Sequence, residues 1–367
     1  MNISAFHPYN KEQTGFTLIE LMVSLFLGLL VSAAAVQVYM INAKTAGIQS
    51  SASELVENST FNLPVIERKI RLANLGLSDK VTADQPGAGI VLTSANNAPK
   101  DGSNKPQLDN LRNPQDIDGT TKLPKNITLD GSAVKVSLLS NTGDQTAGTQ
   151  KNEWTGASNF NSKSGQLTIQ YRAPQDMYDC EGKLALGPRR VNIGGVKEAI
   201  DGQIIVERFY LKAPNASKPT ELSLYCDAGK YITEIMDSYT EQSKPDKSLP
   251  QSVVFETNNK IRDFGDAGQE IVTNVDYFDI LLSTSAGGKI QYYTVKDYLA
   301  LDLNKQPPIV GLKYGLILRS NNAVLTDEGL SEFTVLGKKL TLNTGLNKKY
   351  LRTVTESYVA LRNTSLE

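Results

Sequence analysis

A long apolar segment near the amino end most constrains what this chain can fold into. It runs from Phe16 to Ile41, and Glu20 is its only charged side chain; the next charge is Lys44. A helix needs about 20 residues, at about 1.5 Å of rise each, to cross the apolar core of a bilayer. The segment is long enough, so the sequence predicts a membrane-spanning helix at residues 16–41.

Glu20 needs an explanation, because a carboxylate inside a bilayer costs about 2.5 kcal/mol or more when it has no partner. A cation at the same depth would offset this cost. The α-amino group of Phe16 would supply one if the chain were cut between Gly15 and Phe16. Such a cut would leave residues 1–15 as a leader that is removed from the mature protein.

The amino end resembles the processing site of type IV prepilins and type II secretion pseudopilins. In this chain Gly15-Phe16-Thr17-Leu18-Ile19-Glu20 stands directly ahead of the rest of the apolar segment. The resemblance implies that a prepilin peptidase cuts after Gly15, on the cytoplasmic side of the inner membrane, and N-methylates Phe16. It also implies that Glu20 acts in assembly, as the charge partner of the new terminal amine.

Two other interpretations of this segment explain less. A secretory signal peptide carries its small-residue cleavage site after a shorter apolar region. Ala33–Ala35 could serve as such a site, but the apolar pattern continues beyond it to Ile41. A plain membrane anchor explains the hydrophobicity and leaves Gly15 and Glu20 as coincidences.

The helix is expected to continue beyond the membrane as an amphipathic half at residues 42–76, kinked at Pro64 and ended near Gly76. The apolar stripe before the proline consists of Met40, Ala43, Gly47, Ala52, Leu55, Val56, Ser59 and Leu63. After the proline, the pattern predicts one inward and one outward group: Val65, Ile66, Ile70 and Leu72 inside, and Glu67, Arg68, Lys69 and Arg71 outside.

The remainder of the chain divides into two parts. Residues 77–163 are rich in Gly, Asn, Asp, Ser, Thr and Pro, which predicts loops with a few short strands. In residues 164–367, alternating apolar and polar runs such as Leu167–Tyr171 and Ile205–Leu211 are separated by turn residues, which is typical of antiparallel strands. The sequence therefore predicts an α+β fold, in which a long amino-terminal helix packs on the antiparallel β-sheet of a β-rich globular domain.

Cys180 and Cys226 follow the predicted membrane helix, so they are expected on the periplasmic side. Disulfides persist in that oxidising compartment, which favours a bond between these two residues. The bond would close a loop of about 46 residues and stabilise the fold by roughly 4 kcal/mol in the chain-entropy model. The alternative is a pair of free, buried thiols.

The later part of the chain resembles the PilW-type minor pilins of the type IV pilus. The resemblance rests on short segments that occur in the same order: Asp179–Gly182, Leu224–Cys226, Ile271–Val275, Val310–Ser320 and Val359–Asn363. Together with the amino end, they extend the resemblance over most of the chain outside residues 78–160.

No arrangement of residues points to catalysis or to a cofactor. The only histidine, His7, lies in the predicted leader, and two cysteines without histidine do not make a usual zinc site. Asp116–Gly119 resembles part of a calcium loop but lacks the later acidic ligand, because position 127 is Ile127. The formal net charge of −1 argues against a nucleic-acid-binding surface. We therefore expect no enzyme activity, no cofactor, no metal site and no nucleic-acid partner.

The resemblances imply a structural subunit, a minor pilin that primes fibre assembly and lies in the tip complex of the type IV pilus. Expected partners are other minor pilins, the major pilin, a PilY-type tip adhesin and the prepilin peptidase. The expected location is the inner membrane, with a periplasmic globular domain, and after assembly the pilus tip on the cell surface. Two alternatives stay open: a J-like minor pseudopilin of the type II secretion system, which shares the amino end, and a membrane-anchored binding protein that does not polymerise.

Processing at Gly15 can be tested directly. The mature chain is expected to begin with N-methylated Phe16, and Gly15→Val should leave the chain uncut in the membrane, because the peptidase motif has no place for a larger residue there. Mass spectrometry of the native amino terminus measures both. An intact Met1 in purified wild-type protein would contradict the prediction.

Overall fold

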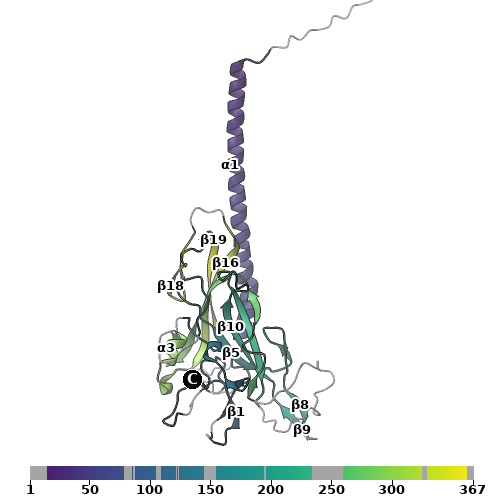
Figure 1. Ribbon diagram of the computed structural model, residues 1–367, viewed down its shortest axis with the longest axis vertical. Helices are drawn as coiled ribbons and strands as arrows, with labels where there is room; N and C mark the ends of the chain where they lie inside the picture. Colours follow the sequence, from purple (N-terminus) through teal and green to yellow (C-terminus); the bar gives the residue numbers. More distant parts are fainter. Residues whose placement is uncertain are drawn as a thin grey trace, which may run out of the picture.

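A continuous helix of 53 residues, Leu18–Ile70, rises from one end of a β-rich domain (Figure 1). The structure is a computed structural model, and it describes residues 15–77, 85, 87–104, 109–120, 122, 124–143, 154–193, 196–233, 259–324 and 329–361. Of the predicted leader, only Gly15 lies within these residues. At about 1.5 Å of rise per residue the helix is about 80 Å long. The predicted α+β class, a long helix on antiparallel sheet, is confirmed.

The helix has three parts: α1 (Leu18–Glu57), a π-helical turn (Asn58–Asn62) and α2 (Leu63–Ile70). Pro64, the second residue of α2, does not end the helix, and the irregular turn comes directly before α2. After Ile70 the chain continues in turns to Gly76, whose φ of +64° is a left-handed conformation that glycine adopts easily.

Two four-stranded antiparallel sheets form the body of the domain. The first has the order β13-β11-β10-β5, and the second has the order β15-β14-β16-β19. The strands of the first sheet are β5 (Leu167–Arg172), β10 (Ile204–Lys212), β11 (Ser223–Tyr231) and β13 (Gln269–Val272). Those of the second are β14 (Val275–Ala286), β15 (Lys289–Tyr293), β16 (Ile309–Ala323) and β19 (Tyr350–Ala360).

Short elements surround these sheets. The paired ones are β1 (Arg112–Ile117) with β2 (Pro124–Asn126), β6 (Met177–Tyr178) with β7 (Leu184–Ala185), β8 (Arg189–Ile193) with β9 (Val196–Ile200), and β17 (Glu332–Val335) with β18 (Lys338–Thr341). A small three-stranded sheet contains β3 (Thr128–Leu129), β4 (Ser132–Ala133) and β12 (Lys260–Ile261). Three single turns of helix complete the set: α3 (Val295–Leu299) and the 3₁₀ turns Val136–Leu138 and Leu303–Lys305.

The main core lies where the lower end of the helix meets both sheets. Leu63, Ile66 and Ile70 follow the i, i+3, i+7 spacing that places them on one stripe of α2, and all three are buried. Leu55 extends this stripe into α1. The stripe packs against inward-facing residues of five strands: Ile169, Ile205, Phe209, Leu224, Phe278, Leu316 and Leu318.

The prediction of which helix residues face the domain is only partly right. Val56 and Val65 were expected to face the domain, but their side chains are 63% and 54% exposed. The π-helical turn between them holds more residues per turn than an α-helix, so it rotates the later residues relative to the earlier ones. Lys69 was expected outside and instead points inward, with a side chain only 13% exposed.

Each sheet also has a second covered face. Successive residues of β10 alternate between two cores: Ile205 faces the helix, whereas Ile204 and Val206 face the opposite side. That side is covered mainly by residues from the polar region 77–163, namely Val91, Leu111, Ile127, Val134, Leu138 and Leu139. The second sheet is covered on its far face by the β17–β18 hairpin and Phe160. The polar region is therefore part of the packed domain where the structure describes it.

The helix core can be tested with two neighbouring residues. Ile66→Ala should lower the free energy of unfolding by about 2–5 kcal/mol, because it opens a cavity against both sheets. Val65→Ala removes apolar atoms from an exposed position and should change the free energy by no more than about 0.5 kcal/mol. Urea unfolding of the detergent-solubilised chain, followed by fluorescence of its single Trp154, measures both. Equal losses in the two variants would contradict this packing.

Candidate functional site

The apolar helix begins with a cap formed by two residues of the processing motif. Thr17 has extended backbone angles, and its side-chain oxygen accepts a hydrogen bond from the backbone N–H of Glu20 at 3.3 Å. Glu20 therefore lies in the first turn, where the positive end of the helix dipole favours an acidic side chain. The Thr-x-x-Glu spacing is a known signal of a helix start that sequence reasoning missed here.

Gly15 and Phe16 lie just before this cap. A Cβ atom added to Gly15 would meet no atom within 4 Å, so the fold does not require glycine at this position. Phe16 is 81% exposed and does not belong to the main core of the described residues. The structure thus brings Gly15, Phe16 and Glu20 together at one end of the helix, while the fold itself explains only the position of Glu20.

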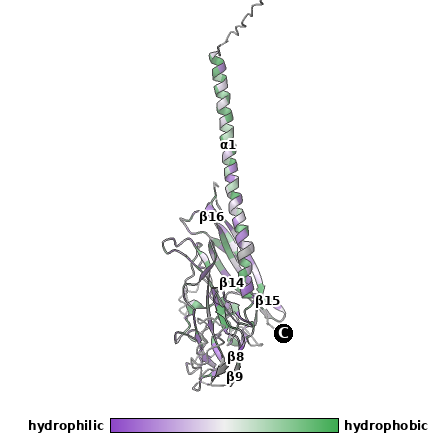
Figure 2. Ribbon diagram, turned by 90° about the vertical axis from the view of Figure 1, so that its right-hand side faces the viewer, coloured by the Kyte–Doolittle hydropathy of each residue, from purple (hydrophilic) through white to green (hydrophobic). Residues whose placement is uncertain are grey.

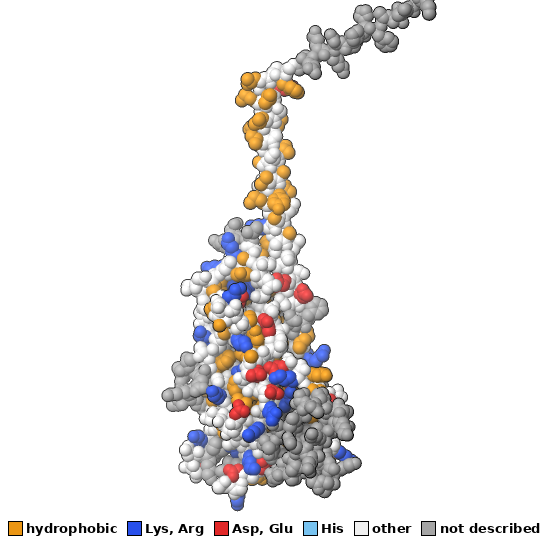
Figure 3. Space-filling model, turned by 45° about the vertical axis from the view of Figure 1, so that its right-hand side comes forward, with side chains coloured by type: hydrophobic (Ala, Val, Ile, Leu, Met, Phe, Trp, Pro, Cys, Tyr) orange, Lys and Arg blue, Asp and Glu red, His pale blue; other side chains and the backbone are white. Residues whose placement is uncertain are grey.

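The upper half of the helix has no covering from the described parts of the chain. Its large hydrophobic side chains from Phe16 to Ile41 are all at least 53% exposed. Figure 2 shows this half as mainly hydrophobic, and Figure 3 shows apolar side chains around it. Within the described residues, this is the one helix that by length and composition could cross a membrane. The first buried residue along it is Ser51.

The two cysteines are joined in the structure. Cys226 lies in β11 and Cys180 follows β6, and their Cα atoms are 6.1 Å apart. Cys226 is buried in the core between the first sheet and the helix. The bond therefore ties the loop after β6 to the face of the sheet that α2 covers.

A buried ion pair lies beside this bond. Lys69 of α2 donates to Oε1 of Glu207 at 2.9 Å, and the carboxylate is fully buried. Tyr171 also donates to this oxygen at 3.0 Å, as does the backbone N–H of Cys180 at 2.8 Å. Burial raises the pKa of Glu207 above its ordinary value, although the nearby Lys69 ammonium opposes the shift. The pair fixes α2 to the first sheet.

A second set of polar contacts ties the helix to the other sheet. Glu67 accepts hydrogen bonds from Tyr314 of β16, at 3.1 Å, and from Ser357 of β19. One turn above the π-helical segment, the carboxylate of Glu54 accepts from the backbone N–H of Asn321 at 3.2 Å. Lys69 and Glu67 thus hold opposite sides of the same helix.

Three carboxylates near the disulfide could suggest a metal site. Oxygen atoms of Glu181, Asp227 and Asp266 lie within 4.8 Å of one another. However, Lys183 contacts Glu181 at 2.9 Å and Arg208 contacts Asp227 at 2.7 Å. Burial raises the pKa of Glu181 and that of Asp227, while these two cations oppose the shifts. The ion pairs account for the cluster as part of the fold.

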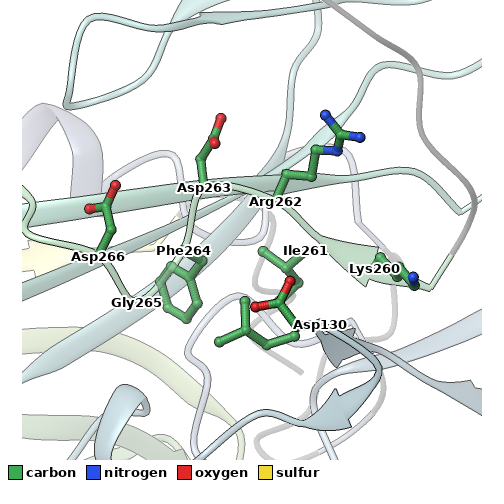
Figure 4. Close-up of a pocket in the computed structure, with 9 residues that line it drawn as sticks. Asp130, Lys260, Ile261, Arg262, Asp263, Phe264, Gly265 and Asp266 are labelled. Atoms are coloured by element: carbon green, nitrogen blue, oxygen red, sulfur yellow. The ribbon is translucent and has the colours of Figure 1, made fainter.

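A neighbouring depression of about 630 Å³ is lined by residues of both charges (Figure 4). Asp263 and Asp266 point away from Asp130 in this view, so their carboxylates do not converge on a common point. The calcium-like fragment at Asp116 also has other partners. That carboxylate contacts Lys125 at 3.0 Å and Asn259 at 2.7 Å, which fits a structural role.

Comparison with known proteins supports the interpretation of the amino end. Residues 10–36 match the family model of the prokaryotic N-terminal methylation motif. The match includes Gly15, Phe16 and Glu20 and extends over the uncovered upper part of α1. The amino end of the chain therefore carries a prokaryotic N-terminal methylation motif.

Two further comparisons add little to this. The chain is similar to the solved structure of a type IV-like pilin from Thermus thermophilus, at 12% sequence identity over 85% of this chain and 98% of that one. The TM-score of 0.31 is too low to carry an argument. The comparison with curated proteins found no match.

The raised pKa of Glu207 predicts a pH dependence of stability. The folded state holds the proton of the Glu207 carboxyl more tightly than the unfolded state does, because in the unfolded chain this carboxyl has its ordinary pKa of 4.5. Stability from this group is therefore present at low pH and lost as the pH rises through the raised pKa. Lys69, Tyr171 and Asp179 are the titratable groups that act on it.

Unfolding free energies of wild type and Glu207→Gln, measured between about pH 4 and 7, isolate this effect. The wild type should lose stability relative to the variant as the pH rises, because only the wild type must ionise a buried carboxyl. A difference that stays constant, or that changes in the opposite direction, would show that the pKa of Glu207 is not raised.

Proposed function

We propose that this chain is a minor pilin of the type IV pilus, of the PilW type, that primes fibre assembly and lies in the tip complex. It is a structural subunit without enzyme activity. The observation that carries the proposal is the register of Gly15, Phe16 and Glu20 at the head of an uncovered apolar helix, joined to a sheet domain. The downstream segments that resemble PilW-type pilins favour the subclass.

Helix packing supplies the physical mechanism. The apolar half of the helix keeps the subunit in the membrane, where its backbone groups are satisfied within the helix. In a fibre, the same half packs against the helices of neighbouring subunits. The charges of Glu20 and of the Phe16 amine then offset each other's loss of hydration. Prepilin peptidase would create that amine by cutting after Gly15.

The proposed partners follow from this role. They are other minor pilins, the major pilin and a PilY-type tip adhesin, with the prepilin peptidase acting before assembly. Before assembly the subunit lies in the inner membrane with its domain in the periplasm, and afterwards at the pilus tip.

A J-like minor pseudopilin of the type II secretion system is the second candidate, because the amino-terminal motif is common to both systems. Expression with secretion genes, and loss of secretion on deletion, would favour it. A membrane-anchored binding protein that never polymerises would instead keep its leader, because its function would need no free amine at Phe16.

Glu20→Ala separates an assembly role from simple anchoring. Insertion and cleavage should be unchanged, because the apolar segment and Gly15 are intact. Recruitment into pili should fall, since the Phe16 amine of the packed helices would lose its partner. Quantitative immunoblots of membranes and of sheared pili measure the two steps.

Glu57→Ala is the matched control: it removes an exposed acid at the last residue of α1, below the membrane segment, and should leave recruitment unchanged. Deletion of the whole chain should lower the number of pili far more than their length, with Glu20→Ala intermediate. Normal pilus numbers in the deletion strain would refute the priming role.

A further inference from the structure

The segment Tyr178–Cys180 contacts both members of the buried ion pair. The backbone N–H of Cys180 donates to Glu207, and the backbone carbonyl of Tyr178 accepts from Lys69 at 3.0 Å. The segment therefore supplies one donor to the carboxylate and one acceptor to the ammonium. Through these two bonds, a loop of the domain takes part in holding α2 on the first sheet.

These bonds matter because the carboxylate is fully buried. All three hydrogen bonds that Glu207 receives go to Oε1, and Oε2 has no hydrogen-bond partner among the described residues. A buried ion pair is stable only when additional hydrogen bonds compensate for lost hydration. Removing the Cys180 N–H would leave the carboxylate with only Lys69 and Tyr171.

Local contacts also hold this segment: the Asp179 carboxylate accepts from the backbone N–H groups of Glu181 and Lys183, and Cys180 packs against the main core. Its strand β6 pairs only with β7, over two residues. Asp179 forms an ion pair with Lys230 of β11 at 3.0 Å, and the bond from Cys180 to Cys226 is the covalent link to the first sheet. The disulfide is thus the strongest constraint that keeps the segment over the ion pair.

We propose that the Cys180–Cys226 disulfide is a redox-dependent latch on α2. In the oxidised protein it holds Tyr178–Cys180 against Lys69 and Glu207. Reduction releases the segment, exposes the ion pair to water and loosens α2 from the first sheet. Glu67 continues to hold α2 to the second sheet, so the effect is local. α2 is joined to α1 through the π-helical turn, so the latch helps to fix the domain on the whole helix. It acts only in an oxidising compartment, where the disulfide persists.

The coupling must act in both directions. Reduction transfers two electrons and two protons from a thiol reductant, such as two glutathione molecules that become glutathione disulfide, and leaves two protein thiols. Thermodynamic linkage is reciprocal. The factor by which loss of the ion pair raises the equilibrium constant for reduction must equal the factor by which reduction lowers the equilibrium constant for docking of α2 through that pair.

The first experiment measures this equilibrium. The full chain in detergent is equilibrated with glutathione buffers of graded ratio, and reduced cysteines are counted by alkylation and mass spectrometry. Lys69→Met should raise the equilibrium constant for reduction about tenfold, which is a shift of about 30 mV to a less negative potential. Arg71→Met is the control, because its side chain is 54% exposed and pairs with Glu67 instead. The same constant in Lys69→Met and wild type would overturn the proposal.

The second experiment follows α2 by hydrogen exchange. In Cys180→Ala/Cys226→Ala, amides of residues 63–72 should lose about tenfold of their protection, whereas those of β14 and β16 keep theirs. Unchanged protection of α2, or an equal loss throughout the domain, would overturn the latch. If this variant does not fold, the glutathione measurement decides alone, since its variants keep both cysteines and start as disulfide-bonded protein. Neither experiment requires a pilus, so both are independent of the proposed function.

Discussion

Burial of one stripe of α2 between two sheets is the constraint on which the rest of the structure depends. Ile66 and Ile70 are almost completely buried there. Full burial of such a side chain contributes about 1.5–3 kcal/mol, so a few residues supply most of the attachment of a helix about 80 Å long. The stripe and inward-facing residues of both sheets form one continuous core. Without the stripe, neither sheet would have a complete core on its helix-facing side.

Polar contacts on either side of the stripe fix how the helix is oriented. Lys69 reaches the first sheet and Glu67 reaches the second. A buried ion pair adds little net stability, because lost hydration offsets most of the attraction, but a displaced helix would leave Glu207 buried without a partner. Apolar packing therefore holds the helix, and the charges specify its rotation. The disulfide contributes to this specification by placing the backbone of Cys180 against the same carboxylate.

The two halves of the helix have opposite requirements. The lower half is covered by its own domain, whereas the described residues leave the upper half uncovered. Water is a poor solvent for so much apolar surface, so lipid or other helices must cover it. Glu20, at the start of this half, is compatible with lipid or with packed helices only if its charge is compensated. This contrast makes the upper half of the helix dependent on a partner other than the described residues.

The local features of the chain were readable from its residues, because they depend on near neighbours. The apolar segment, the Gly15-Phe16 junction, Glu20 and the alternating strands needed only composition and spacing. The position of Cys180 and Cys226 beyond the predicted membrane helix favoured a disulfide over two free thiols. The inward position of Lys69 could not be predicted, because its partner Glu207 is far away in sequence and is brought close only by sheet pairing. Val65 was misplaced because the sequence pattern gave no sign of the π-helical turn that rotates α2 relative to α1. The sequence by itself determined a helix, its processing motif and a β-rich domain. Only the tertiary structure decided which side of the helix is buried, since that depends on which distant strands meet it.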